Sequence, residues 1–235
     1  GLNDWTFSPK YEMKQFESSQ NLTNLSIDYS AGVIETKFYD GDKIIVEYPE
    51  SSRYTTKVTE DNGTLSIVSG KRHWYDVSFW TGKIPKAVVS IPNGLVLDVS
   101  AELHAGVVTI GDGTFGDVTL RMNAGTVNFG NTVCEKFQLD LNAGAVYVGG
   151  ATCNSLVTKV NAGTAEIKNL ICNDIKAVVN AGGLQIKIDG VKTEYTISVE
   201  KNAGSCNLSG QTGSTEGKKI DAKVNAGSLD VKFIN

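Results

Sequence analysis

The stretch DLNAGAVYVGG, residues 140–150, joins an Asn-Ala-Gly tripeptide to a run in which apolar and polar residues alternate. The tripeptide occurs six times, and successive copies are 19, 19, 19, 22 and 23 residues apart. The copies begin at Asn123, Asn142, Asn161, Asn180, Asn202 and Asn225. HAG at His104 and SAG at Ser30 add two related copies. A sequence that repeats at a nearly fixed period indicates a repeat architecture, and alternation with period 2 is typical of β-strands.

Alignment of the copies on the Asn gives two apolar columns. The column four residues after the Asn contains Val108, Val127, Val146, Ala165, Leu184, Cys206 and Leu229, and the column six residues after it contains Ile110, Phe129, Val148, Ile167, Ile186, Leu208 and Val231. Columns of this kind predict strands stacked over one continuous core. We therefore predict an all-β fold, a single-stranded parallel β-solenoid (β-helix) with coils of about 19 residues, whose neighbours pair about 4.8 Å apart.

The repeat divides the chain into two continuous parts. Residues 95–235 are predicted to form the regular β-solenoid with Asn-Ala-Gly corners, and residues 1–94 to form irregular N-terminal β coils and a cap. The extra residues in DGVKTEY (189–195) and GQTGSTEGKK (210–219) are expected to be loop insertions. The chain ends half a coil after the last tripeptide. We therefore expect an open C-terminal solenoid edge, through which a homodimer would form.

The tripeptide itself is predicted to turn a corner within the stack. Gly supplies a positive φ, Asn tolerates left-handed backbone angles, and Ala is small enough for a tight interior corner. Asn residues stacked at one position also predict an amide ladder made of the six Asn residues that begin the copies. The alternative is a row of Asn side chains that bind a ligand. His104, at the Asn position of an earlier copy, is expected to cap the ladder.

A charged column stands two residues before the Asn. It contains Glu102, Arg121, Asp140, Lys159, Val178, Glu200 and Lys223. The first four members alternate in sign, which favours pairing between adjacent strands, and the column is expected to face solvent. One position later, Lys201 interrupts a column that is otherwise apolar, and the sequence offers no explanation for it.

The cysteines raise the question of a metal or disulfide site. Cys134, Cys153 and Cys172 are 19 residues apart, in a column that continues to Phe115 on one side and Val191 on the other. We therefore expect free thiols buried in an apolar row, and the alternative is a disulfide between two of the three.

Motifs for catalysis are absent from the sequence, which lacks HExxH, GxSxG and P-loop patterns. Glu166 and Asp230 share a column, but at three coils apart they would be too distant for paired acid and base work. We expect no enzyme activity, no catalytic residues, no metal site and no cofactor.

The segment KRHWYDVSFW, residues 71–80, holds an aromatic cluster of Trp74, Tyr75, Phe79 and Trp80. Because a solenoid must cover its ends, these side chains are expected to cap the N-terminal end. The alternative is an exposed patch that binds sugar rings or a partner protein.

Composition narrows the range of partners. A net charge of −4 and a pI near 5.3 argue against nucleic acid, which usually requires a basic stripe. The apolar runs are shorter than the roughly 20 residues of a membrane helix. The chain begins at Gly1 without Met, so we expect that a targeting segment has been removed.

The corners followed by alternating strands, with the segments LSIDYSAGVIETKF and VSIPNGL before them, resemble the DUF4097-type family of adhesin candidates over about residues 20–235; GIN-type head domains are a related alternative. The resemblance implies a bacterial, extracytoplasmic β-solenoid at the cell surface, held by a membrane anchor outside this sequence. It supplies no functional residues.

The function expected from the sequence and the resemblance is that of a non-catalytic adhesin or surface-binding module for a surface glycan or protein. The alternative is a cell-envelope stress-sensing or regulatory module that acts through a protein partner.

Overall fold

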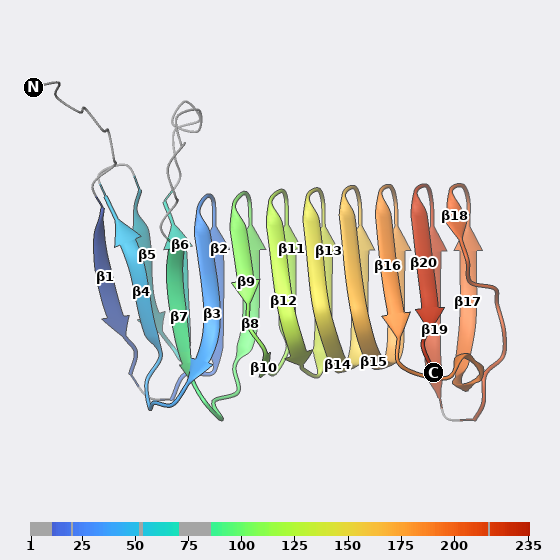
Figure 1. The fold of residues 1–235 in the computed structure, drawn as a ribbon, viewed down its shortest axis with the longest axis horizontal. Helices are drawn as coiled ribbons and strands as arrows, with labels where there is room; N and C mark the ends of the chain where they lie inside the picture. Colours follow the sequence, from blue (N-terminus) through green and yellow to red (C-terminus); the bar gives the residue numbers. More distant parts are fainter. Residues whose placement is uncertain (1–10, 20, 52–53, 71–85, 216) are drawn as a thin grey trace, which may run out of the picture.

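The computed structural model describes residues 11–19, 21–51, 54–70, 86–215 and 217–235. These residues form β-strands and one short 3₁₀ helix, η2 (Lys192–Glu194). The strands make a mixed, mostly parallel sheet that bends back on itself into two facing layers, and tight turns join the layers along one narrow edge (Figure 1). The predicted all-β fold is confirmed, and its strands pair mostly but not entirely in parallel.

The first layer is a ladder of strands whose order in space differs from their order in the chain. From one end to the other it contains β5 (Thr56–Asp61), β6 (Thr64–Ser69), β2 (Asn24–Tyr29), β8 (Asp98–Leu103), β11 (Val118–Met122), β13 (Lys136–Leu141), the second halves of β14 (Ala145–Val160) and β15 (Thr164–Val179), β19 (Lys218–Val224) and β17 (Tyr195–Lys201).

The second layer faces the first. It contains β1 (Glu12–Glu17), β4 (Ile45–Glu50), β7 (Lys86–Pro92), β3 (Val33–Tyr39), β9 (Val107–Ile110), β12 (Thr126–Val133) with the short β10 (Gly113–Thr114) at its end, the first halves of β14 and β15, β16 (Gly183–Ile188), β20 (Ser228–Phe233) and β18 (Ser205–Cys206). Among the strands that the structure describes, antiparallel pairs occur at the N-terminal end, where β1 pairs with β4, β4 with β7 and β5 with β6.

The register of the regular strands matches the columns of the sequence. Leu120 on β11 pairs with Leu139 on β13, and Val127 on β12 pairs with Val146 on β14. The inward residues of both layers are buried in one hydrophobic core. The layers contact each other through aromatic rings, and Phe129 and Phe137 meet edge to face with their centroids 5.0 Å apart. Alternation along each strand thus places the apolar columns between the layers.

The corners depend on Gly because the main chains of neighbouring corners touch. Gly144 has a φ of 96°, and a Cβ atom built on it would lie 2.4 Å from the carbonyl oxygen of Gly125 in the next corner. Two details of the predicted corner are wrong. The corner Asn residues do not have a positive φ, and the Ala lies at the outer side of the turn, where Ala124 and Ala162 are exposed.

The N-terminal end of the stack is built out of chain order. β2 pairs with β8 on one side and with β6 on the other, and β3 lies likewise between β9 and β7. The SAG copy at Ser30 therefore stacks directly on the HAG copy at His104, and the backbone nitrogen of His104 donates to the carbonyl oxygen of Tyr29 at 2.9 Å.

The C-terminal end shows a similar exchange, which overturns the expected C-terminal edge. β19 lies between β15 and β17, and β20 lies between β16 and β18. The last strands of the chain are therefore inside the stack, and the end is formed by the coil that contains Asn202 (Figure 1). The prediction was wrong because it assumed that the coils stack in chain order, whereas the last coil pairs with β15 and β16 on one side and with β17 and β18 on the other.

The exchange explains the charged residue in the apolar column. Lys201 belongs to the end strand β17 and is exposed, so no strand covers its side chain. The insertion at 210–219 partly covers the same strand, because Ile197 and Gln211 exchange two backbone hydrogen bonds of 2.8 and 3.0 Å. This segment reduces the unpaired edge that an end strand would otherwise expose.

We predict that Gly163→Ala lowers the free energy of unfolding by about 3 kcal/mol. Ala adopts a left-handed φ only at a cost in energy, and its methyl group would overpack the contact between corners. A Cβ at this position would lie 2.3 Å from the carbonyl oxygen of Gly144. Urea unfolding followed by circular dichroism measures the loss.

The matched control is Gly94→Ala. Gly94 has a φ of 83°, and a Cβ on it would meet nothing within 4 Å, so only the cost of the backbone angle, about 1 kcal/mol, is expected. Equal losses in the two variants would show that the contact between corners does not constrain the stack.

Candidate functional site

The corner Asn residues form a continuous series of side-chain hydrogen bonds along one narrow edge. Each amide nitrogen donates to the amide oxygen of the neighbouring corner over 2.6–2.8 Å. From donor to acceptor the order is Asn202, Asn225, Asn180, Asn161, Asn142 and Asn123. All links therefore point toward the N-terminal end of the stack. Asn225 lies between Asn180 and Asn202 in this series because the last coil of the chain lies inside the stack.

His104 continues this series. Asn123 Nδ2 lies 3.0 Å from His104 Nδ1, and the other ring nitrogen faces two carboxylates. Nε2 lies 3.3 Å from Asp28 Oδ1 and 3.6 Å from Glu102 Oε1. These three side chains form a group of imidazole and carboxylate donors that could hold a metal ion. Sequence reasoning did not connect Asp28 with Glu102, although both stand two residues before a corner.

The outer face of the second layer carries a hydrogen-bonding column. Successive members pair in register and include a hydroxyl, amides, a phenol and a carboxylate, in the order Thr109, Asn128, Tyr147, Glu166 and Gln185. The side chain of Tyr147 is 42% exposed. Strand spacing places the groups of this column about 4.8 Å apart, so the face offers an aromatic ring between an amide and a carboxylate.

Glu166 and Asp230 lie closer than the sequence suggested. Gln185 pairs with Glu166 on one side and with Asp230 on the other. The two acids are therefore separated by one strand, and the expected distance of three coils is wrong because the last coils are exchanged. The Asp230 carboxylate accepts a hydrogen bond of 2.6 Å from Asn207.

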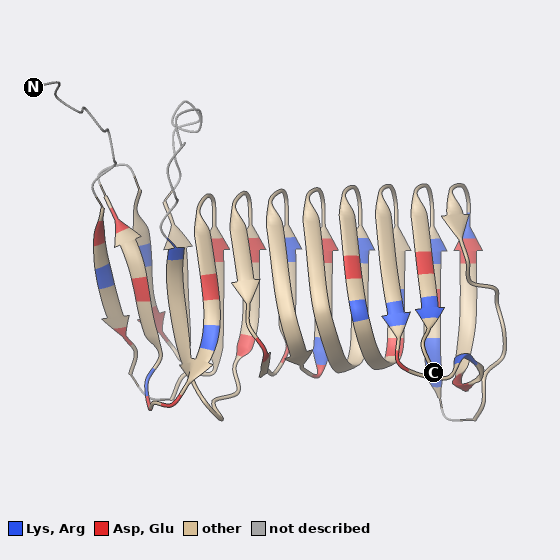
Figure 2. Ribbon diagram, in the orientation of Figure 1, with Lys and Arg blue, Asp and Glu red and all other residues tan. Residues whose placement is uncertain are grey.

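The outer face of the first layer carries the charged column. Along β8, β11, β13 and β14 the signs alternate through Glu102, Arg121, Asp140 and Lys159 (Figure 2). At the far end Lys223 pairs with Glu200 at 3.3 Å. A shallow hollow near that pair is lined by charged and small side chains, namely Lys176, Ala177, Val178, Ser198, Val199, Glu200, Asp221, Ala222 and Lys223.

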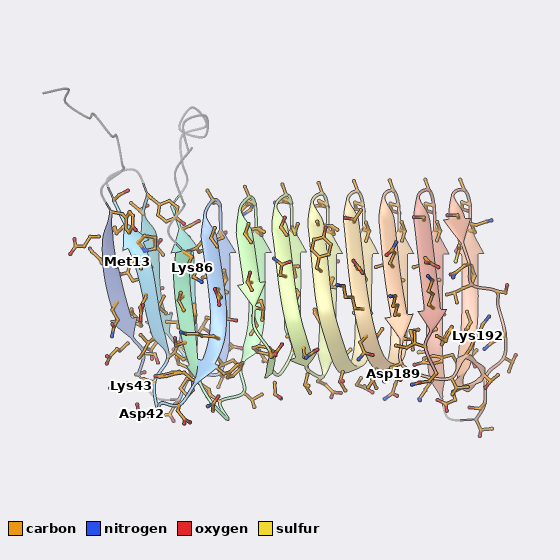
Figure 3. All side chains as sticks on the ribbon, viewed as in Figure 1. Met13, Asp42, Lys43, Lys86, Asp189 and Lys192 are labelled. Carbon is orange, nitrogen blue, oxygen red and sulfur yellow. The ribbon has the colours of Figure 1, made fainter. Side chains whose placement is uncertain are left out.

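The edge opposite the corners carries a short row of exposed β-branched side chains. Val133, Thr152 and Ile171 pair in register and are exposed, with Val133 at 44% and Ile171 at 47%. Charged side chains lie at both ends of this edge, Asp42 and Lys43 at one end and Asp189 and Lys192 at the other (Figure 3).

The cysteine column is buried. Cys134, Cys153 and Cys172 are free thiols with exposed fractions of 8% or less, which confirms the expected buried thiols. Val191 does not continue the buried row, because it is 44% exposed. Tyr195 covers this end instead, and its hydroxyl donates to the carbonyl oxygen of Cys172 at 2.7 Å.

The surroundings of these thiols disfavour the thiolate. The hydrogen bond with Cys134, together with burial, raises the pKa of Cys153 to about 12. The hydrogen bond with Cys153 and burial likewise raise the pKa of Cys172. Thiolate is the form that reacts and binds metals, so this column is a structural part of the core.

The aromatic cluster Trp74, Tyr75, Phe79 and Trp80 lies outside the residues that the structure describes. Whether it caps the stack or forms a patch stays a prediction. Among the described residues, no helix has the length and apolar character needed to cross a membrane.

Two facing layers of mostly parallel strands, with columns of like position and stacked glycine corners, define a parallel β repeat protein. The family model described as Toastrack DUF4097 matches residues 22–235. The chain belongs to this family, which confirms the resemblance drawn from its corners.

Several solved structures are similar to this chain. An adhesin candidate from Bacteroides fragilis is 16% identical with a TM-score of 0.49, and covers 97% of this chain and 98% of its own. An adhesin candidate from Parabacteroides distasonis is 9% identical with a TM-score of 0.48, and covers 96% and 97%. A candidate cell adhesion protein from Clostridium sporogenes is 12% identical with a TM-score of 0.32, and covers 96% and 100%. A comparison with curated proteins gave no match.

We predict that Asn161→Asp lowers the free energy of unfolding by about 1–2 kcal/mol, because a carboxylate accepts hydrogen bonds but cannot donate one. Asn142 Oδ1 would lose its donor, while Asn180 Nδ2 would keep an acceptor. Chemical unfolding at neutral pH measures the change.

Asn128→Asp serves as the control, because it is the same substitution on the outer face of β12, away from the ladder. A change there of less than about 0.5 kcal/mol is expected for a surface substitution. If the two variants lose the same stability, the ladder contributes nothing beyond the added charge.

Alkaline pH is predicted to destabilise the fold through the cysteine column. A thiol whose folded pKa is raised contributes stability that is complete below its ordinary value and is lost as pH rises toward the folded value. For Cys153 this window runs from 9.0 to about 12. The midpoint of urea unfolding should therefore fall across this range.

A variant with Cys153→Ala and Cys172→Ala should show a smaller fall over the same range, although it starts from lower stability because cavities are left. Thiol labelling at pH 8 provides the structural control: in the native chain only the half-buried Cys206 should react quickly. Parallel pH curves for the two proteins would contradict the assignment.

Proposed function

We propose that this chain is a non-catalytic surface-binding module of the adhesin type, which works outside the cytoplasmic membrane. In this proposal it is a single-stranded parallel β-solenoid whose regular coils have about 19 residues, and it binds a surface glycan or a surface protein through the outer face of its second layer. The location is the one implied by the family resemblance.

The observation that carries the proposal is the exposed Tyr147, which pairs in register with Asn128 on one side and Glu166 on the other. A tyrosine ring offers an apolar surface together with a polar hydroxyl. The flanking amide both donates and accepts hydrogen bonds, and the carboxylate accepts them. A sugar ring or an extended peptide needs this combination of stacking and hydrogen bonding.

The repetition of the face supports weak contacts made many times. Thr109 and Gln185 continue the column on either side of the central residues. Linked weak sites gain affinity because each further contact is intramolecular. A long, regular ligand such as a polysaccharide would engage several members of the column together.

The test is co-sedimentation of the purified chain with bacterial cell walls, extracellular matrix and glycan-coated beads. We expect saturable binding to at least one surface, weakened about tenfold or more by Tyr147→Ala. Val157→Ala is the matched control, because Val157 is 37% exposed on the opposite layer, and its binding should equal that of the unmodified chain.

A further variant, Trp74→Ala with Trp80→Ala, separates the two candidate surfaces. Loss of binding in this folded variant but not in Tyr147→Ala would place binding on the aromatic cluster and overturn the assignment to the second layer. No binding to any surface would overturn the adhesin proposal and favour a regulatory module with a protein partner.

A further inference from the structure

One cluster of ligand-forming side chains lies where the N-terminal coil joins the regular stack. Asp28 is on β2, Glu102 is on the adjacent strand β8, and the two residues are direct partners in the parallel register. His104 follows β8 at the corner. One donor atom from each of the three lies within 4.8 Å of the others. Two paired strands therefore hold the donors together, although Asp28 and His104 are far apart in the sequence.

The charges at this point differ from those along the rest of the column. From Glu102 to Lys159 each charged residue pairs with one of opposite sign. Asp28 and Glu102 are like charges placed directly opposite each other, an arrangement that destabilises a sheet. Figure 2 shows the two acidic positions on neighbouring strands. A cation between them would remove the repulsion.

Arg121 is the basic residue nearest in register, because it pairs with Glu102 on the side away from Asp28. Within the described part of the chain, the ion pairs of both carboxylates are nevertheless formed with His104. Their side chains remain 44% and 49% exposed, and that of His104 is 40% exposed. Water therefore has access to complete a coordination shell.

The second ring nitrogen of His104 is already held by a side chain. A histidine that binds a metal through one nitrogen usually donates from the other to a fixed acceptor, which orients the ring. Asn123 Nδ2 lies 3.0 Å from Nδ1 in the observed ladder. Metal binding through Nε2 would require the opposite orientation of the ladder amides, in which the Asn123 oxygen accepts from Nδ1–H and Nε2 is left free as a ligand.

We propose that Asp28, Glu102 and His104 bind one divalent transition-metal ion of the zinc class, with water in the remaining positions. Imidazole and carboxylate are both ligands of Zn²⁺, whereas Ca²⁺ and Mg²⁺ prefer oxygen donors alone. The ion would tie β2 to β8, a junction that the chain itself does not connect directly. Metal binding would thereby fix the first coil onto the stack.

The experiment is isothermal titration of the untagged, chelator-treated chain with Zn²⁺, together with thermal unfolding with and without Zn²⁺. We expect one ion per chain and a higher unfolding temperature when Zn²⁺ is present. His104→Asn and Asp28→Asn should each weaken binding about tenfold or more and abolish the thermal shift. His104→Asn is compatible with the fold, because Asn occupies this position in the six other corners.

Two controls test whether the other histidine or a carboxylate elsewhere in the column binds Zn²⁺. His73→Asn changes the other histidine of the chain, which lies outside the described residues, and Glu200→Gln removes a carboxylate from the far end of the same column. Both should bind Zn²⁺ as the unmodified chain does. The proposal is overturned if the unmodified chain binds no Zn²⁺, if His104→Asn or Asp28→Asn binds it equally well, or if Ca²⁺ binds as tightly as Zn²⁺.

Discussion

The close approach of neighbouring corners is the constraint on which the rest of the structure depends. A Cβ on Gly182 would lie 2.1 Å from the carbonyl oxygen of Gly163, so the stack closes only around a residue without a side chain. This contact fixes the main chain of each corner at the strand spacing, and the strands on both sides inherit the same register. Because side chains alternate with period 2, a slip of one residue would turn every apolar column outward. The amide ladder follows from the same spacing, because it brings Asn142 within hydrogen-bond distance of Asn123.

The shape of a coil could be predicted from the sequence because its causes are local and repeated. Each regular copy carries the corner glycine and the two inward positions, and the structure buries Val127 and Phe129 where the columns place them. The same reasoning predicted the burial of Cys153. It erred on the corner Ala, because a small residue is tolerated on the outside of a turn as well as inside it, and the letters alone do not distinguish these cases.

The order of the coils could not be predicted, since a repeat specifies what a coil is and not which coil lies beside it. β2 sits between two strands that are distant from it in the chain, and β19 sits between β17 of the preceding coil and the more distant β15. The signals were departures from the pattern: spacings of 22 and 23 residues, and Lys201 in an apolar column. A charged residue such as Lys201 at an apolar position suits a strand that has a neighbour on one side only. The same limit hid the pairing of Asp28 with Glu102, and it misplaced Asp230 relative to Glu166.

The polarity of the ladder explains why its first position differs chemically from the others. Within the series an Asn uses one end of its amide toward each neighbour, so Asn161 donates to Asn142 and accepts from Asn180. Beyond His104 the next corner carries Ser30, whose backbone nitrogen donates to the hydroxyl of Ser69. The carboxylates of β2 and β8 face the side chain at position 104. An Asn at position 104 would accept the hydrogen bond from Asn123, but its shorter side chain would leave only its other amide group near the two carboxylates. The imidazole ring of His104 has two nitrogens on opposite sides, so one meets Asn123 while the other faces Asp28 and Glu102. Histidine at this corner therefore joins the amide series to the acidic pair, and its departure from the repeat has a physical cause in the order of the strands.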